Sequence, residues 1–354
     1  MRRMILGVSS ERNSHSPAFR LRIRTVSSRL RAPFLLLVAC ALAALPLSGS
    51  RARAETLFGL DESNRIFSFD SATPSSITFV NGGLPITGLA ADESLLGIDM
   101  RPVATNSPAA ASNGVLYALG LTNRLYTINT SKGEATQVGT AGAFTLNGSA
   151  FGIDFNPVPD RLRVVSELDQ NLRLNPNDGS LAAVDTALAY ASGDSGFGVN
   201  PNVVGAAYAN NFGGATQTTL YGIDSNRDAL VLIGGINGVP SPNSGQLTTV
   251  GPLGANTINE VGFDISGLSG TAFASLSTRV GPLDTSSDLY SVNLATGAAT
   301  LVGSIGQGGG PGAFITRDIA AAVGAPVPEP VGSAMLATAL GVLACCRKRR
   351  EPAE

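Results

Sequence analysis

The chain has 354 residues, with 24 Lys plus Arg, 26 Asp plus Glu and one His, so its formal net charge is −2. Its ends carry most of the basic residues: residues 55–326 hold 10 Lys plus Arg against 22 Asp plus Glu, a net charge of −12. This acidic body argues against a nucleic-acid partner, because contact with phosphates requires a basic surface.

The residue types of the body restrict its chemistry further. The single histidine, His15, and the three cysteines, Cys40, Cys345 and Cys346, all lie in the terminal segments, and the chain has no Trp. The body therefore lacks Ser-His-Asp and Cys-His machinery, and zinc or copper sites are disfavoured. We expect a protein that is not an enzyme and has no resident metal or other cofactor, with calcium as the one cofactor left open.

Residues 1–54 have the pattern of a secretory signal peptide. A segment with eight Arg (1–31) precedes an apolar run (32–47), and Ala52-Arg53-Ala54 is a small-residue cleavage site. The alternative is a membrane-spanning anchor, but the apolar run is shorter than the roughly 20 residues that spanning requires.

Residues 55–323 are predicted to form an all-β domain, because strand-like runs alternate with Asn, Asp, Gly and Pro turns and no helical period is sustained. The first unit has runs at 56–61, 65–70 and 76–80. Later units open on a Gly-x-Asp run and continue with three more runs; they begin at Gly97, Gly152 and Gly262, with a degenerate copy near Gly205. Gly97 and Gly152 are 55 residues apart, and Gly262 follows 110 residues later. This period with four strands per unit favours a β-propeller.

The two ends of the body predict how the repeats close. The first unit lacks the Gly-x-Asp run, and the last run, 313–319, has no partners after it. Pairing of the two would give a ring of five four-stranded blades and remove exposed sheet edges. The alternatives are six blades, one of them within residues 192–214, or an open β-solenoid.

Several motifs suggest a family. Leu116-Tyr117, Gly152 to Pro157, Arg161 to Val165 and Leu289 to Asn293 resemble a bacterial family of secreted, propeller-like domains of unknown function. The resemblance covers about residues 56–323. It implies the fold and attaches no activity.

Asp99, Asp154 and Asp264 occupy one equivalent position on the expected innermost strands and are the candidate binding residues. In a ring they would point toward one region, where oxygen ligands suit a hard cation such as calcium and carboxylate pairs suit glycoside chemistry. The structural alternative is that each Asp accepts backbone N–H groups at its own strand-to-turn bend. Recurrence in successive repeats favours this structural alternative.

The Asn-Arg pairs at Asn64, Asn123 and Asn226 have two interpretations. They suit a polar rim for glycan hydroxyls, or hairpin turns, since Asn tolerates positive φ. We favour turns, and we expect the six Tyr to belong to the core rather than to a sugar-stacking surface.

Residues 324–354 carry a second three-part signal. Pro328-Glu329-Pro330 precedes an apolar stretch (331–346) and a basic cluster (347–350). In this order the three parts resemble the PEP-CTERM sorting signal of Gram-negative bacteria. The resemblance implies that an exosortase-type transpeptidase recognises Pro328-Glu329-Pro330 and removes the tail. Before processing, about 24 Å of apolar helix would hold the protein in the membrane with its basic end in the cytoplasm; the alternative is a plain C-terminal anchor.

The whole sequence predicts an exported binding or structural module of the cell envelope or surface, with exopolysaccharide as a possible partner. The alternative functions are a carbohydrate-active enzyme or a calcium-binding module that uses the Asp residues at the channel.

Overall fold

The structure is a computed structural model that describes residues 54–103, 106–279, 285–306 and 315–323. Ala52, Pro328, Glu329, Pro330 and the two predicted apolar segments lie outside these residues. Among the described residues, no helix is both long and apolar enough to cross a membrane.

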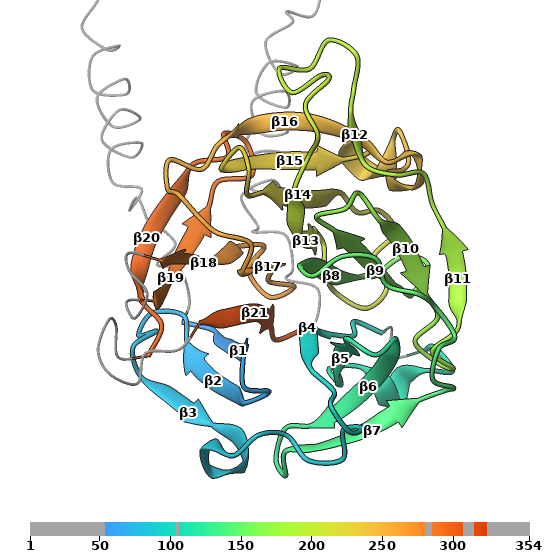
Figure 1. The fold of residues 1–354 in the computed structure, drawn as a ribbon, viewed down its shortest axis with the longest axis vertical. Coiled ribbons are helices and arrows are strands. Elements are labelled where there is room, and N and C mark those ends of the chain that lie inside the picture. Colours follow the sequence, from blue (N-terminus) through green and yellow to red (C-terminus); the bar gives the residue numbers. More distant parts are fainter. Residues whose placement is uncertain (1–53, 104–105, 280–284, 307–314, 324–354) are drawn as a thin grey trace, which may run out of the picture. The chain divides into compact units, whose positions relative to one another are not determined.

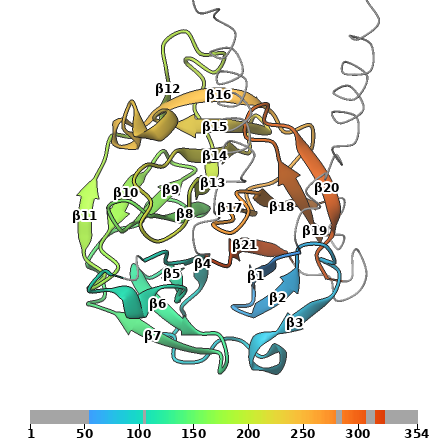
Figure 2. The ribbon, with the colours of Figure 1, turned by 180° about the vertical axis from the view of Figure 1, so that it is seen from behind.

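The described chain forms five antiparallel sheets arranged as blades around an axis, which confirms the predicted five-bladed propeller (Figures 1 and 2). From the axis outward the first blade is β21 (Thr316–Ala321), β1 (Thr56–Asp61), β2 (Ile66–Asp70) and β3 (Ile77–Phe79). The second is β4 (Leu95–Met100), β5 (Leu116–Gly120), β6 (Arg124–Asn129) and β7 (Glu134–Val138). The third is β8 (Phe151–Asn156), β9 (Arg161–Ser166), β10 (Asn171–Leu174) and β11 (Leu181–Val184).

The fourth blade is β13 (Val203–Tyr208), β14 (Leu220–Asp224), β15 (Ala229–Ile233) and β16 (Gln246–Pro252), with β12 (Ala189–Tyr190) added in parallel at its outer edge. The fifth is β17 (Val261–Ile265), β18 (Ala272–Arg279), β19 (Thr285–Val292) and β20 (Ala299–Ser304). Short 3₁₀ helices lie in the connections: η1 (Val80–Gly83), η2 (Ala110–Ser112), η3 (Ile236–Gly238) and η4 (Pro242–Ser244).

The ring closes as the sequence predicts. Strand β21 pairs antiparallel with β1, and Ile319 lies opposite Gly59. The open solenoid is therefore wrong. The six-blade alternative is also wrong, because residues 203–208, within the region thought to hide a blade, form the innermost strand of the fourth blade.

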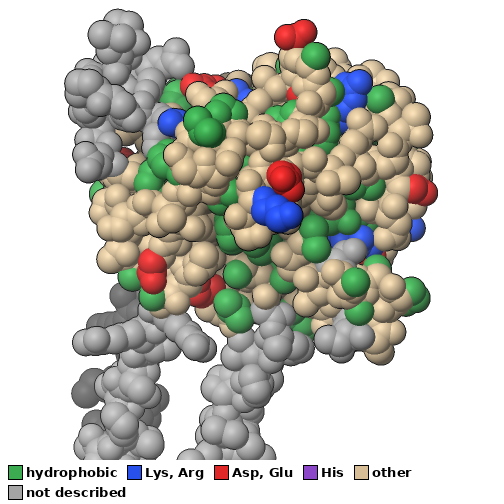
Figure 3. Space-filling model, turned by 90° about the horizontal axis from the view of Figure 1, so that it is seen from below, with side chains coloured by type: hydrophobic (Ala, Val, Ile, Leu, Met, Phe, Trp, Pro, Cys, Tyr) green, Lys and Arg blue, Asp and Glu red, His purple; other side chains and the backbone are tan. Residues whose placement is uncertain are grey.

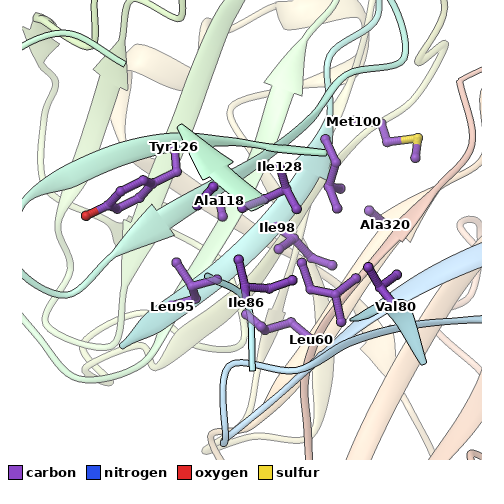
Figure 4. Packing of buried hydrophobic residues seen from close by; sticks show 13 residues of the cluster. Leu60, Val80, Ile86, Leu95, Ile98, Met100, Ala118, Tyr126, Ile128 and Ala320 are labelled. Atoms are coloured by element: carbon purple, nitrogen blue, oxygen red, sulfur yellow. The ribbon is translucent and has the colours of Figure 1, made fainter. Parts of the chain in front are cut away.

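The hydrophobic core is divided among the interfaces between blades. Each of five buried clusters draws its members from two neighbouring blades. In one of them Leu60 of the first blade packs with Ile98 and Tyr126 of the second (Figure 4). Burial of apolar surface between adjacent sheets therefore holds the ring together.

The glycine of the Gly-x-Asp motif permits close approach of the innermost strands. A Cβ at Gly152 would lie 2.6 Å from the backbone N of Ala206, and a Cβ at Gly262 would lie 2.5 Å from that of Ile319. Only a residue without a side chain fits there, which explains why the motif begins with Gly.

The face in Figure 3 shows few charged side chains, and they are scattered rather than gathered into a patch of one sign.

Candidate functional site: a buried carboxylate cluster and a polar pocket

The three predicted Asp side chains converge on the axis of the ring. Asp99 on β4, Asp154 on β8 and Asp264 on β17 are at most 1% exposed. One carboxylate oxygen from each lies within 4.8 Å of the others. Equivalent positions in three repeats are therefore brought together into one buried cluster.

Two of these side chains connect neighbouring blades. Asp99 accepts hydrogen bonds from the backbone N–H of Met100 (2.6 Å) and from that of Phe155 in the next blade (2.7 Å). Asp264 repeats the arrangement with Ile265 (2.6 Å) and with Ala321 of the closing strand (2.5 Å). The bond to the following residue agrees with the structural alternative, whereas the bond to the next blade is not predicted by it.

Asp154 differs from its two equivalents. Its side chain is 0% exposed, and within the described residues neither of its oxygens makes a hydrogen bond. The backbone N–H of Tyr208, at the corresponding place in the next blade, is close enough to lower the pKa of Asp154, but burial and the charges of Asp99 and Asp264 raise that pKa more. Asp154 therefore resists ionisation unless a proton or a cation supplies positive charge.

A fourth buried carboxylate, Asp318, lies on β21, and the sequence reasoning missed it. It is 4% exposed and accepts from the backbone N–H groups of Ile98 and Ile319, both at 2.9 Å. The backbone of Asp318 lies against Gly262 of the preceding blade, just as the backbone of Gly205 lies against Gly152. Asp318 therefore occupies the position on its strand that the motif's glycine holds in other blades. The signal available in the sequence was an Asp in the run predicted to close the ring.

Burial is the largest influence on all four carboxylates. It raises the pKa of Asp99, with the charge of Asp264 next, and it raises the pKa of Asp264. Burial also raises the pKa of Asp318 well above its ordinary value, against its backbone hydrogen bonds. The cluster therefore favours uptake of positive charge, either protons or a cation.

A second candidate site is a cavity of about 330 Å³ at one end of the interface between the third and fourth blades. It is lined by polar groups of both blades: Asn156, Arg163, Arg173, Thr216, Gln217, Thr218, Asn237, Ser241 and Asn243, with Val158, Pro159, Gly238 and Pro242. Sequence reasoning missed this pocket, whose walls come from separate loops and strands.

Two arginines of the pocket share one carboxylate. Arg163 Nη1 and Arg173 Nε lie 2.6 and 2.7 Å from the same oxygen of Asp185. Although burial raises the pKa of Asp185, hydrogen bonds from both guanidinium groups lower it more, and the net pKa is below its ordinary value. Asp185 is therefore ionised at neutral pH, and the three side chains together carry one positive charge.

Two of the predicted Asn-Arg turns are confirmed, with φ of 58° at Asn64 and 60° at Asn123. Their side chains also form hydrogen bonds with the segment that precedes the innermost strand of the next blade. Asn64 Nδ2 donates to the carbonyl of Glu93, and Asn123 Oδ1 accepts from the N–H of Leu146, both at 2.8 Å. These hydrogen bonds favour the structural interpretation for this pair. Near Asn226 the positive φ falls on Asp228 instead. Five of the six Tyr are buried, which confirms their place in the core.

These features define a closed five-bladed β-propeller with a carboxylate cluster on its axis. Residues 65–315 match the family described as "Domain of unknown function (DUF4394)". The match spans more than half of the chain, and the chain belongs to this family.

No curated protein matches the chain. Among solved structures it is similar to a candidate 6-phosphogluconolactonase of Bacteroides uniformis, at 13% identity and a TM-score of 0.37, over 73% of this chain and 84% of that one. It is also similar to PorZ, a surface component of the type-IX secretion system of Porphyromonas gingivalis, at 13% identity and a TM-score of 0.34, over 70% of this chain and 29% of that one. With TM-scores below 0.5, neither structure informs the activity of this chain.

Proposed function

We propose that this protein is an exported, non-catalytic binding module of the bacterial envelope whose ligand is an anionic exopolysaccharide. The observation that carries the proposal is the cavity of about 330 Å³ between the third and fourth blades, which is lined by both polar and apolar groups and is large enough for one or two sugar rings.

The chemistry of the pocket suits a hydroxyl-rich ligand with acidic groups. The side chains of Gln217 and Asn237 make no hydrogen bond within the described residues and can pair with sugar hydroxyls. Arg173 is 28% exposed, so its guanidinium is accessible to a carboxylate on the ligand. Arg163, at 1% exposure, holds the wall of the pocket through Asn243 (2.8 Å) and Tyr208 (3.2 Å).

The absence of catalysis is part of the proposal. A glycosidase places two carboxyl groups on either side of an accessible sugar bond. Asp99, Asp154 and Asp264 are at most 1% exposed, and their clustered oxygens leave no room for a sugar between them. The body also lacks His and Cys.

Export and sorting rest on the two terminal signals. We propose cleavage after Ala54, membrane retention through the apolar segment 331–346, and removal of the tail by an exosortase-type transpeptidase at Pro328-Glu329-Pro330. Intact-mass measurement of the protein from a host with and without an exosortase tests this step. In the host with an exosortase we expect a protein that lacks both ends. In the host without one we expect a protein that has lost residues 1–54 and keeps residues 331–354. A mature protein that keeps residues 331–354 in the host with an exosortase would contradict the proposal.

Binding is tested with two soluble polysaccharides, the polyuronate alginate and neutral dextran. We expect alginate to bind and Arg173→Ala to weaken binding about tenfold, since one charge-assisted hydrogen bond contributes roughly 1.5 kcal/mol. The matched control is Lys132→Ala, which removes an exposed positive charge from the second blade.

Equal binding by Arg173→Ala and the native protein would overturn the pocket assignment. Release of reducing ends from either polysaccharide would overturn the non-catalytic assignment.

A further inference from the structure

We propose that the carboxylates of Asp99, Asp154 and Asp264 bind one calcium ion on the axis of the propeller, with the side-chain oxygen of Asn211 as a fourth ligand. The site joins the second, third, fourth and fifth blades. It does not depend on the pocket or on its ligand.

The first support is the unpaired state of Asp154. Ionised carboxylates accept hydrogen bonds and donate none, so Asp264 can satisfy Asp154 only when one of the two carboxyl groups holds a proton. A fully buried charge without a partner is strongly destabilising, and a bound cation removes that penalty. Both oxygens of Asp154 are buried and lack hydrogen bonds within the described residues, which leaves them available as ligands.

The second support comes from outside the carboxylates. Asn211 follows β13, an innermost strand whose Asp-equivalent position holds an alanine, Ala207. Its side chain is 1% exposed and lies close enough to Asp264 for a hydrogen bond, which opposes in part the rise that burial causes in the pKa of that carboxyl. The amide oxygen of Asn211 has no hydrogen-bond partner in the described part of the chain, although it is buried beside the cluster. The fourth blade thus contributes a neutral amide oxygen to the proposed site, whereas the second, third and fifth blades contribute carboxylates.

The oxygens already used in hydrogen bonds remain able to bind a cation. Each oxygen of Asp99 and Asp264 accepts one backbone N–H and keeps a second lone pair. These bonds also fix the orientation of both carboxylates before any ion arrives. The site is therefore preorganised by the backbone of the neighbouring strands.

The donor set and spacing favour calcium among the metals. All candidate ligands are oxygens, which select hard cations, and the body has no His or Cys for zinc or copper. Oxygens at most 4.8 Å apart at the corners of a triangle lie at most about 2.8 Å from its centre, a spacing that can hold a calcium ion with bonds of 2.3–2.6 Å. Calcium also accepts irregular sets of oxygen ligands, whereas magnesium demands a nearly ideal octahedron.

A shared proton is the competing explanation, and Asp154→Asn separates the two. The purified full chain is refolded in EGTA or in about 1 mM CaCl₂, its metal content is measured by mass spectrometry, and its Tm is recorded. We expect about one calcium per chain and a Tm higher by roughly 5–10 °C in calcium. Asp154→Asn should lose both effects, yet in EGTA it should melt at or above the native protein, because it removes one buried negative charge.

The matched control is Asp318→Asn, which alters a buried Asp of the same ring that is not among the proposed ligands. It should lower Tm in both buffers, because Asp318 accepts two backbone N–H groups, and it should keep the response to calcium. A native protein that contains no calcium and melts at the same temperature in both buffers would overturn the proposal, whatever the variants do. An Asp154→Asn protein with an unchanged calcium response would also overturn it.

Discussion

Replacement of Gly152 by alanine tests the close approach of the innermost strands. The new Cβ would lie 2.6 Å from both Ala206 N and Gly205 C, whereas ordinary contact begins near 3.4 Å. Because both atoms belong to the backbone, relief requires a shift of β13 by several tenths of an ångström. We expect a loss of about 3 kcal/mol or more in the free energy of unfolding, the upper end for overpacked sites, and a Tm lower by roughly 6–12 °C.

The control for this experiment is Gly303→Ala. Gly303 lies on β20, and its nearest neighbour would be the side chain of Pro74, at 3.2 Å from the new Cβ. A side-chain contact at 3.2 Å needs an adjustment of only a few tenths of an ångström, and the alanine restricts the unfolded chain, so the net change should be within about 1 kcal/mol. Thermal unfolding followed by far-UV circular dichroism measures both variants. If Gly152→Ala melted within the error of Gly303→Ala, the reasoning about the innermost strands would be refuted.

Two further predictions concern pH and closure. Burial raises the pKa of Asp99, Asp154 and Asp318, so the folded protein holds protons that the unfolded chain releases above its ordinary Asp pKa. The stability of the protein in EGTA should therefore fall as pH rises from about 4.5 to 8, by about 1.4 kcal/mol per pH unit for each proton released; stability that rises over this range would contradict the prediction. Asp185 and Asp194 have lowered pKa values, so their contribution is lost only below about pH 4 and does not mask the effect. For closure, Ile319→Pro removes a buried ladder position opposite Gly59 and should lower Tm by at least about 6 °C, while an unchanged Tm in thermal unfolding would mean that β21 does not hold the ring.

Much of the fold could be predicted because the innermost strands carry a distinctive pattern. Gly97, Gly152 and Gly262 mark three inner strands because the crowded axis admits no side chain there. Closure of the ring could also be predicted, because the first unit lacked one strand and the repeat region ended with a strand that had no partners after it. With the degenerate copy near Gly205 counted as a unit, the closed first unit and the four later ones make five blades.

The candidate sites were less predictable, because their members come from different repeats. Gly205-Ala206-Ala207 keeps the glycine and loses the Asp, so the sequence gives no hint that Asn211 follows it toward the axis. Asp318 lies two positions before the one at which the motif would place an Asp. In the pocket, Arg163 and Asn243 are 80 residues apart and meet only after the third and fourth blades have packed.

The edge of each blade at the axis explains why carboxylates rather than apolar side chains occupy the centre. An innermost strand has a partner on one side only, so its other edge presents N–H groups that are buried away from water and must find acceptors. Asp99, Asp264 and Asp318 accept six such N–H groups, two each: one from the Asp's own strand and one from the innermost strand of a neighbouring blade. Asp154 accepts none within the described residues and yet is the most deeply buried of the four. Hydrogen bonds from the backbone therefore account for three of the carboxylates, and the calcium ion that we propose would account for the fourth, Asp154.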